Sequence, residues 1–93
     1  MCKSSFDPDE KSVIEEIVLD VNKLEGSLPT ELGRLTTLQK LSLGSNSISG
    51  SIPTELGLLY ELEWLGLGGN YLIGELPKEL GSLTKLERLS VCK

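Results

Sequence analysis

The string GSIPTELG at residues 50–57 is the middle one of three near-identical strings in a short chain. GSLPTELG stands at 26–33 and GELPKELG at 74–81, so the string recurs at an interval of 24 residues. A fixed period between about 20 and 50 residues is typical of a repeat protein, in which each period forms one structural unit. The local motifs are therefore interpreted within this repeat.

A short strand and a turn are predicted upstream of each string, and one further strand is predicted after the last string. Apolar residues alternate there, which predicts a strand with one face directed inward. These residues are Ile17 and Leu19, Leu41 and Leu43, Leu65 and Leu67, and Leu89 and Val91. Asn22, Asn46 and Asn70 follow the strands at the same period. Because a buried Asn side chain can bond both carbonyl and N–H groups of a turn, we expect a structural ladder of these residues along the stack.

The string itself predicts a short helical turn. Its first glycine suits a turn with positive φ or close packing, and its proline presets the start of a helix. Its last glycine, which is Gly33, Gly57 or Gly81, is expected to end the helix as the C′ residue. Since so short a segment cannot form a stable α-helix alone, it is predicted to be a 3₁₀ turn held by its neighbours.

The units are expected to stack into one domain. Three full units begin at Ile14, Leu38 and Leu62, and a partial fourth begins at Leu86. No unit can bury its apolar face alone, and about three units are the expected minimum for stability. We therefore expect a repeat domain over residues 13–93 and an N-terminal tail or cap remnant over residues 1–12. The fourth unit is incomplete, so we hypothesise a slice of a longer array or a truncated product, with self-association through the uncapped fourth coil.

The pattern LxxLxLxxNxLxGxLPxxLGxLxx resembles the plant-type leucine-rich repeat. That repeat occurs in receptor-like kinases, receptor-like proteins and secreted inhibitors of plants, and in similar proteins of algae. The resemblance covers residues 13–93 and implies an α/β leucine-rich-repeat solenoid, or horseshoe, with a short parallel β-sheet on its concave face and 3₁₀ turns on its convex face. It also implies recognition of proteins or peptides on the concave face. The chain lacks the family's paired-cysteine cap around a Trp-x-Gly-Val-x-Cys pattern, unless Cys2 is its remnant.

Side chains between the inward leucines are expected to face the concave side in columns, one residue from each unit. One column is Glu16, Lys40, Trp64 and Arg88, and the next is Val18, Ser42, Gly66 and Ser90. Trp64 is the only tryptophan of the chain, and aromatic and Arg residues are the usual anchors of binding energy. Trp64 is either such an anchor or a surface residue that Lys40 and Arg88 cover by cation–π contacts.

Two functions are compatible with this surface. The first is a protein- or peptide-recognition module of a receptor-like or repeat-only protein, whose small residues form a floor for a peptide backbone. Its predicted ligand-binding residues are Trp64, Lys40, Arg88, Glu16, Ser42, Gly66 and Ser90. The alternative is a structural spacer or scaffold whose coils contact no ligand. Tyr60 and Tyr71 lie outside the predicted strands and are interpreted as edge packing.

Composition argues against other functions. The net charge of −5 disfavours nucleic acid and an anionic membrane surface as partners. The chain has no His, so Ser–His and Cys–His nucleophile pairs are impossible, and its two distant cysteines cannot hold zinc. We expect no enzyme activity, no cofactor and no metal. Glu31, Glu55 and Glu79 recur with the repeat and are interpreted as solvated charges of the convex face.

The location of the protein is left open by the sequence. No stretch approaches the roughly 20 apolar residues of a membrane-spanning helix, and the polar start MCKSSFDPDEKS has no signal-peptide pattern. We expect no membrane insertion by this chain, and an extracellular or cell-surface location if it is part of a receptor-like protein. Cys2 and Cys92 are about three strand spacings, or ~14 Å, apart, which exceeds the reach of a disulfide. Two independent thiols are expected, with Cys92 on the concave side.

Overall fold

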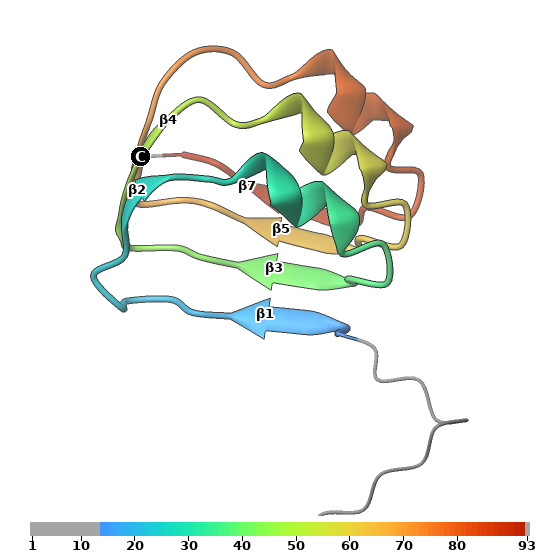
Figure 1. Ribbon diagram of the computed structural model, residues 1–93, viewed down its shortest axis with the longest axis horizontal. Coiled ribbons are helices and arrows are strands. Elements are labelled where there is room, and N and C mark those ends of the chain that lie inside the picture. Colours follow the sequence, from blue (N-terminus) through green and yellow to red (C-terminus); the bar gives the residue numbers. More distant parts are fainter. Residues whose placement is uncertain (1–13, 93) are drawn as a thin grey trace, which may run out of the picture.

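The chain winds through successive coils that stack side by side. The structure is a computed structural model, and it describes residues 14–92. Each of the first three coils contains a strand of one sheet, a turn, a further extended segment and a short helix that leads to the next strand (Figure 1). The predicted tail at residues 1–12 lies outside the described residues.

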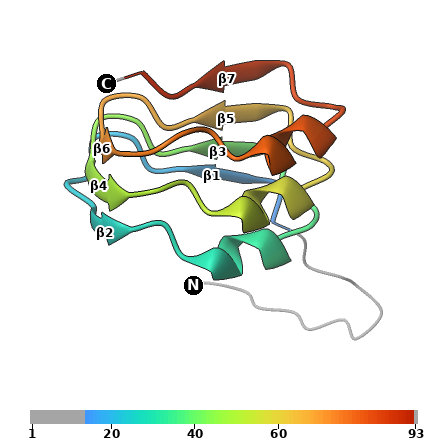
Figure 2. The same cartoon turned by 90° about the horizontal axis from the view of Figure 1, so that it is seen from above.

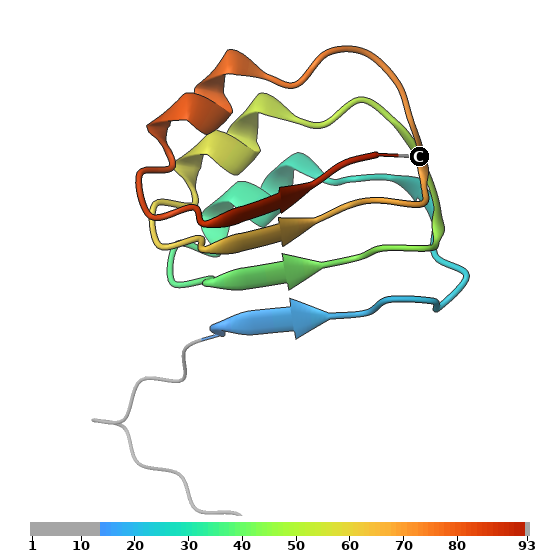
Figure 3. The same cartoon turned by 180° about the vertical axis from the view of Figure 1, so that it is seen from behind.

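The first sheet follows the 24-residue period. Its four parallel strands are β1 (Glu16–Val18), β3 (Lys40–Ser42), β5 (Trp64–Gly66) and β7 (Arg88–Ser90), in that order. Glu16 pairs with Lys40, Lys40 with Trp64, and Trp64 with Arg88. The predicted parallel sheet is confirmed, and Figure 3 shows its four strands lying side by side.

Short helices line the opposite side of the stack (Figure 2). They are η1 (Thr30–Arg34), η2 (Thr54–Leu58) and η3 (Lys78–Ser82), and all three are 3₁₀ helices, as predicted. Each follows a proline at its N-cap, and the φ angles of Pro29, Pro53 and Pro77 are −75°, −69° and −60°. The ring of proline fixes φ near these values, so it sets the direction in which the helix starts.

The glycines of these helices have a different role from the one predicted. Gly33, Gly57 and Gly81 lie inside η1, η2 and η3 rather than after them, so the assignment of all three as C′ residues is wrong. A Cβ atom added to Gly33 would lie 2.6 Å from the carbonyl oxygen of Glu55, and one added to Gly57 would lie 2.6 Å from that of Glu79. These glycines are therefore needed because consecutive helices pack with their backbones in close contact.

A second parallel sheet, which the sequence did not predict, connects the two sides of the stack. Its strands are β2 (Glu25–Ser27), β4 (Ser47–Gly50) and β6 (Tyr71–Leu72). Glu25 pairs with Ser47, and Ser49 pairs with Tyr71, so the partners are 22 residues apart rather than 24. Each coil is therefore displaced by two residues against its neighbour in this sheet, whereas in the first sheet equivalent residues stand beside each other.

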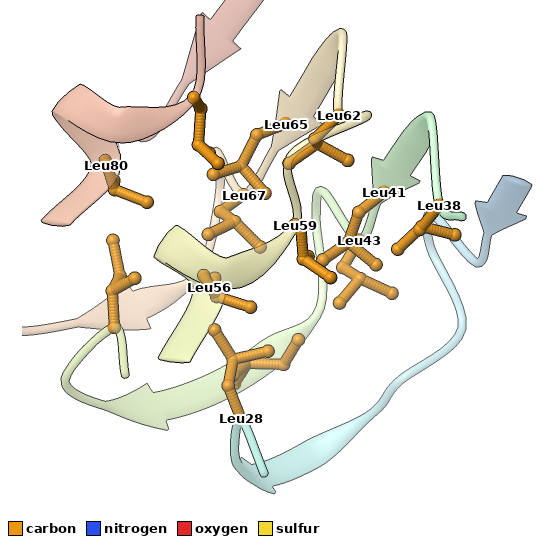
Figure 4. Close-up of a cluster of buried hydrophobic side chains, with 13 residues drawn as sticks. Leu28, Leu38, Leu41, Leu43, Leu56, Leu59, Leu62, Leu65, Leu67 and Leu80 are labelled. Atoms are coloured by element: carbon orange, nitrogen blue, oxygen red, sulfur yellow. The ribbon is translucent and has the colours of Figure 1, made fainter. Parts of the chain in front are cut away.

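The hydrophobic core lies between the first sheet and the helices (Figure 4). Its completely buried side chains come from the second and third coils, and they are Leu38, Leu41, Leu56, Leu59, Leu62, Leu65 and Leu67. Each contributes about 1.5–3 kcal/mol by its burial. In the outer coils Leu19 and Leu89 stay 43% and 42% exposed, because only one described coil covers each of them.

Buried asparagines join neighbouring coils. Oδ1 of Asn46 accepts hydrogen bonds from the backbone N–H groups of Asn22 and Leu24, at 2.8 and 3.0 Å. Nδ2 of Asn46 donates to the carbonyls of Leu19 and Leu43, at 3.0 and 2.9 Å. One side chain thus closes its own turn and bonds the turn of the preceding coil.

Asn70 repeats this arrangement one coil later. Its Oδ1 accepts from the N–H of Ile48 at 3.0 Å, and its Nδ2 donates to the carbonyls of Leu43 and Leu67. Asn22 is exposed, and its Nδ2 bonds only the nearby carbonyl of Asp20 within the described residues.

The tyrosines lie on the surface of the stack. Tyr60 is 53% exposed and Tyr71 is 67% exposed, and neither packs against the hydrophobic core, so their interpretation as edge packing stays a prediction. Tyr71 begins β6, and its neighbour Leu72 is the residue of that strand that packs against the core.

Within residues 14–92, no helix has the length and apolar character needed to cross a bilayer.

Candidate ligand-binding face

The outward surface of β1, β3, β5 and β7, called the strand face below, carries two adjacent hollows. Strand pairing places Glu16, Lys40, Trp64 and Arg88 in one row across this face, in the order that the sequence predicted. The backbones of paired strands lie about 4.8 Å apart, so residues in one row are within reach of the same ligand.

Hydrogen bonding at the start of each strand exposes two successive side chains per coil. The carbonyl of Gln39 accepts from the N–H groups of both Glu63 and Trp64, at 2.8 and 3.1 Å. The carbonyl of Glu63 accepts in the same way from Glu87 and Arg88. One carbonyl has two lone pairs and can accept both bonds, and both donor residues line the charged hollow described next.

The first hollow, called the charged hollow, lies at the start of the strands. It is lined by Glu16, Gln39, Lys40, Glu63, Trp64, Glu87 and Arg88. Gln39, Glu63 and Glu87 were not predicted as site residues. They stand directly before the strand in each unit, and their 24-residue spacing is the signal that could have identified them.

The second hollow, called the small-residue hollow, lies further along the strands. Its floor is formed by glycines and serines, among them Ser42, Gly66 and Ser90, and Cys92 lies at its C-terminal side. Cys92 is exposed and free, as expected, whereas Cys2 lies outside the described residues. The predicted floor residues and the predicted row of charged residues therefore belong to two hollows rather than to one.

Trp64 separates the two hollows and lines both of them. A Cβ atom on Gly66 would lie 2.9 Å from Cζ2 and 3.2 Å from Cε2 of the indole, so the ring extends along β5 over the backbone of Gly66. Cζ of Arg88 lies 6.0 Å from the ring centroid, which is a cation–π contact at the outer limit of its range. Among residues 14–92 the corresponding contact with Lys40 is not formed, so Arg88 alone supplies the predicted cation.

Asp20 borders the small-residue hollow from the first coil. A Cβ atom on Gly44 would lie 3.1 Å from Oδ2 of Asp20, so this carboxylate leans over Gly44 toward the second coil. The residues equivalent to Asp20 in the later coils are Gly44, Gly68 and Cys92, and Asp20 was not predicted as a site residue from the sequence. The absence of a side chain at Gly44 is what allows the carboxylate to reach the hollow.

The carboxylates of the helices lie on the other side of the stack. Glu31, Glu55 and Glu79 stand in the first turns of η1, η2 and η3. Hydrogen bonds from the backbone N–H of Glu31 and from the hydroxyl of Thr30 hold the pKa of the Glu31 carboxyl below its ordinary value. Within the described part of the chain, no three carboxylate or thiol side chains are grouped as metal ligands would be.

Known proteins share both the repeat and the coil. The profile of the Leucine Rich Repeat family matches residues 37–59 and 61–83. In a comparison with curated proteins, nothing matched. Among solved structures, the crystal structure of PEPR1–AtPEP1 superimposes with a TM-score of 0.85 at 41% identity, over 86% of this chain and 11% of that one.

Further solved structures come from Arabidopsis thaliana. The leucine-rich-repeat ectodomain of the plant membrane receptor kinase GASSHO1/SCHENGEN3, in complex with CASPARIAN STRIP INTEGRITY FACTOR 2, has a TM-score of 0.79 at 40% identity. It is matched over 81% of this chain and 9% of that one. The BIR3–SERK2 complex has a TM-score of 0.80 at 34% identity, over 89% of this chain and 45% of that one.

These likenesses, together with the coil, define the class of protein. The chain belongs to the leucine-rich-repeat family, and its repeats are of the plant type and resemble those of receptor kinase ectodomains. It spans about a tenth of the length of the first two structures and less than half of the third.

Proposed function

We propose that this chain is a protein- or peptide-recognition module, and that its strand face binds the ligand. Trp64 is the proposed anchor, with Lys40, Arg88 and Glu16 beside it in the charged hollow and Ser42, Gly66 and Ser90 in the small-residue hollow. Two compared structures are complexes whose names include a second component, AtPEP1 or CASPARIAN STRIP INTEGRITY FACTOR 2, which supports a protein or peptide as the partner class. As part of a receptor-like protein, the module would act outside the cell.

The position of Trp64 is the observation that carries this proposal. The ring lies between two hollows on an outward surface, although the core of the stack is built almost entirely from leucine and isoleucine. A large aromatic side chain next to desolvated small residues is the usual environment of a residue that dominates binding energy. Recognition rather than catalysis is proposed because the strand face offers contact area and charge.

Selection of displayed peptides against the purified chain tests this function. For the selected peptides, Trp64→Ala should weaken binding by about 2 kcal/mol or more, the range of a binding anchor. Tyr60→Ala removes an exposed aromatic side chain outside both hollows, so it should leave the affinity unchanged. A change below about 0.5 kcal/mol for Trp64→Ala would contradict the anchor role.

A further inference from the structure

We propose that the strand face recognises a basic peptide, held in an extended conformation with Lys or Arg side chains against the carboxylates of the two hollows. This inference rests on the proposed function and specifies its ligand. It is carried by the charges that line the hollows, by their lack of partners within the described chain, and by the distance between them.

Acidic groups outnumber basic groups around the hollows. The acidic ones are Glu16, Asp20, Glu63 and Glu87, and the basic ones are Lys40 and Arg88. In the part of the chain that the structure describes, the one ion pair joins Lys85 to Glu61 at 2.7 Å, and neither residue lines a hollow. Within residues 14–92 the two cations of the strand face therefore form no ion pair with its carboxylates. An interface with such a surface favours a partner of complementary charge.

The arrangement of the carboxylates creates two places for a cation. Glu63 and Glu87 stand in equivalent positions of adjacent coils, where the N–H of Glu87 bonds the carbonyl of Glu63. Like charges side by side on paired strands repel each other, and a ligand cation between them relieves this repulsion. Arg88 does not serve that purpose, because its guanidinium is directed to the ring of Trp64.

The second place is the carboxylate of Asp20. It leans over Gly44 into the small-residue hollow, and within residues 14–92 its oxygens accept no hydrogen bond. Around it the floor is made of glycine and serine, so a Lys or Arg side chain can approach without a steric clash. A carboxylate with unused acceptor positions beside an open floor suits an ammonium or guanidinium group.

The separation of the two places sets the length of the ligand. Asp20 and Glu63 are two strand spacings apart across the sheet and five residue positions apart along it. With ~4.8 Å per strand spacing and ~3.3 Å per residue, the backbone separation is about 19 Å, which roughly six residues of extended chain can span. The peptide would cross the glycine floor diagonally and pass the ring of Trp64.

The proposed probe is a set of three synthetic peptides of six residues. Each has Gly-Ser-Gly-Ser in its centre and Lys, Gln or Glu at both ends, and each is acetylated and amidated so that only the side chains carry charge. Because Trp64 is the only tryptophan, its fluorescence reports binding at the boundary of the two hollows. We expect the Lys peptide to bind most tightly and the Glu peptide least, and we expect added salt to weaken the Lys peptide most.

Matched variants assign the effect to the two places. Asp20→Asn and Glu63→Gln should each weaken the Lys peptide by about two- to fivefold, the effect of one exposed ion pair. Neither should change the affinity of the Gln peptide. Glu75→Gln, which removes the same charge from an exposed position outside both hollows, is the control and should have no effect on either peptide.

The outcomes separate this inference from the function on which it rests. If the Gln or Glu peptide binds at Trp64 as tightly as the Lys peptide, the strand face is a binding face but the preference for a basic ligand is wrong. Equal effects of Glu75→Gln and Glu63→Gln on the Lys peptide would reduce the preference to net charge and overturn the two assigned places. If no peptide changes the fluorescence of Trp64, the preference for a basic peptide is wrong, whereas the proposed function is decided separately by the selection of displayed peptides.

Discussion

At the scale of single residues, Val21 shows what the turn after each strand demands. Its φ angle is 56°, and the equivalent residues Ser45 and Gly69 have φ angles of 55° and 72°. The left-handed region costs an L-residue about 1–2 kcal/mol, and a β-branched side chain is among the least suited to it. The turn therefore imposes its backbone conformation on all three coils, although glycine occupies the position in only one of them.

Replacing Val21 tests this strain. Asn tolerates the left-handed conformation, so Val21→Asn should raise the free energy of unfolding by about 1 kcal/mol. The gain should not be offset by lost packing, since Val21 is 75% exposed. At the equivalent position of the third coil, Gly69→Ala should destabilise the chain, because the added Cβ would lie 3.1 Å from the backbone nitrogen of Ser45. Urea unfolding measures the free energy of unfolding of both variants. A loss of stability in Val21→Asn would show that Val21 is not strained in solution.

The asparagines differ in a way that mutation can resolve. Asn46→Ala should lower the free energy of unfolding by about 3 kcal/mol, because the N–H groups of Asn22 and Leu24 and the carbonyl of Leu43 lose their partner. Asn22→Ala removes the same side chain from an exposed position with one local bond, and it should cost less than about 1 kcal/mol. Similar losses in the two variants would mean that the amide of Asn46 contributes little to joining the coils.

At the scale of elements, contact between consecutive 3₁₀ helices depends on the absence of a side chain. A Cβ on Gly57 would lie 2.6 Å from the carbonyl oxygen and 2.7 Å from the Cβ of Glu79 on the next helix. Gly57→Ala should therefore destabilise the chain by about 2 kcal/mol through overpacking. At Gly81 an added Cβ meets no atom within 4 Å, so Gly81→Ala should change stability by less than about 0.5 kcal/mol. Thermal unfolding measures the stability of both variants, and equal shifts in their melting temperatures would contradict close packing of the helices.

The first sheet and the 3₁₀ helices could be predicted because their apolar, proline and glycine residues recur at the same positions of each unit. The second sheet could not be predicted in this way. Aligning the units by 24 residues sets Glu25 beside Ser49, whereas the sheet pairs Glu25 with Ser47. Its strands, EGS, SISG and YL, also have no shared apolar alternation. When the register of a sheet differs from the sequence period, the paired residues do not stand at equivalent positions of the repeat, so aligning the units does not reveal them.

The candidate site also has one part that could be predicted from the sequence and another that could not. The row of Glu16, Lys40, Trp64 and Arg88 follows from strand pairing alone, so the sequence was sufficient to assemble it. The directions of the side chains do not follow from strand pairing: the ring of Trp64 lies over Gly66, and this contact depends on a χ angle that no spacing determines. The part that these residues play in binding stays a prediction.

At the scale of the whole molecule, each coil is stabilised by its immediate neighbours, as in other repeat proteins. The backbone N–H groups of Leu19, Leu43 and Leu67 make equivalent bonds to the next strand, at 2.8, 2.8 and 2.6 Å. Leu43 joins the two central coils, whereas the other two bonds each involve an outer coil. We expect the amide of Leu43 to exchange with solvent at least about tenfold more slowly than those of Leu19 and Leu67.

Hydrogen exchange followed by NMR measures these three rates under one condition. Since the three bonds have similar length and the same place in the repeat, a difference in rate reflects how many coils protect each amide rather than local geometry. Three equal rates would mean that the stack opens as one cooperative unit, and the nearest-neighbour description would then be wrong.

The two-residue displacement in the second sheet has a consequence for any longer array built to the same pattern. Two strand residues correspond to about 6.6 Å of slippage per coil on one side of the stack and none on the other, so each added coil is rotated a little further than the last. An array of many such coils would form a twisted superhelix rather than a flat arc. A straight ligand could then contact the strand faces of only a few consecutive coils before the sheet rotates away from it.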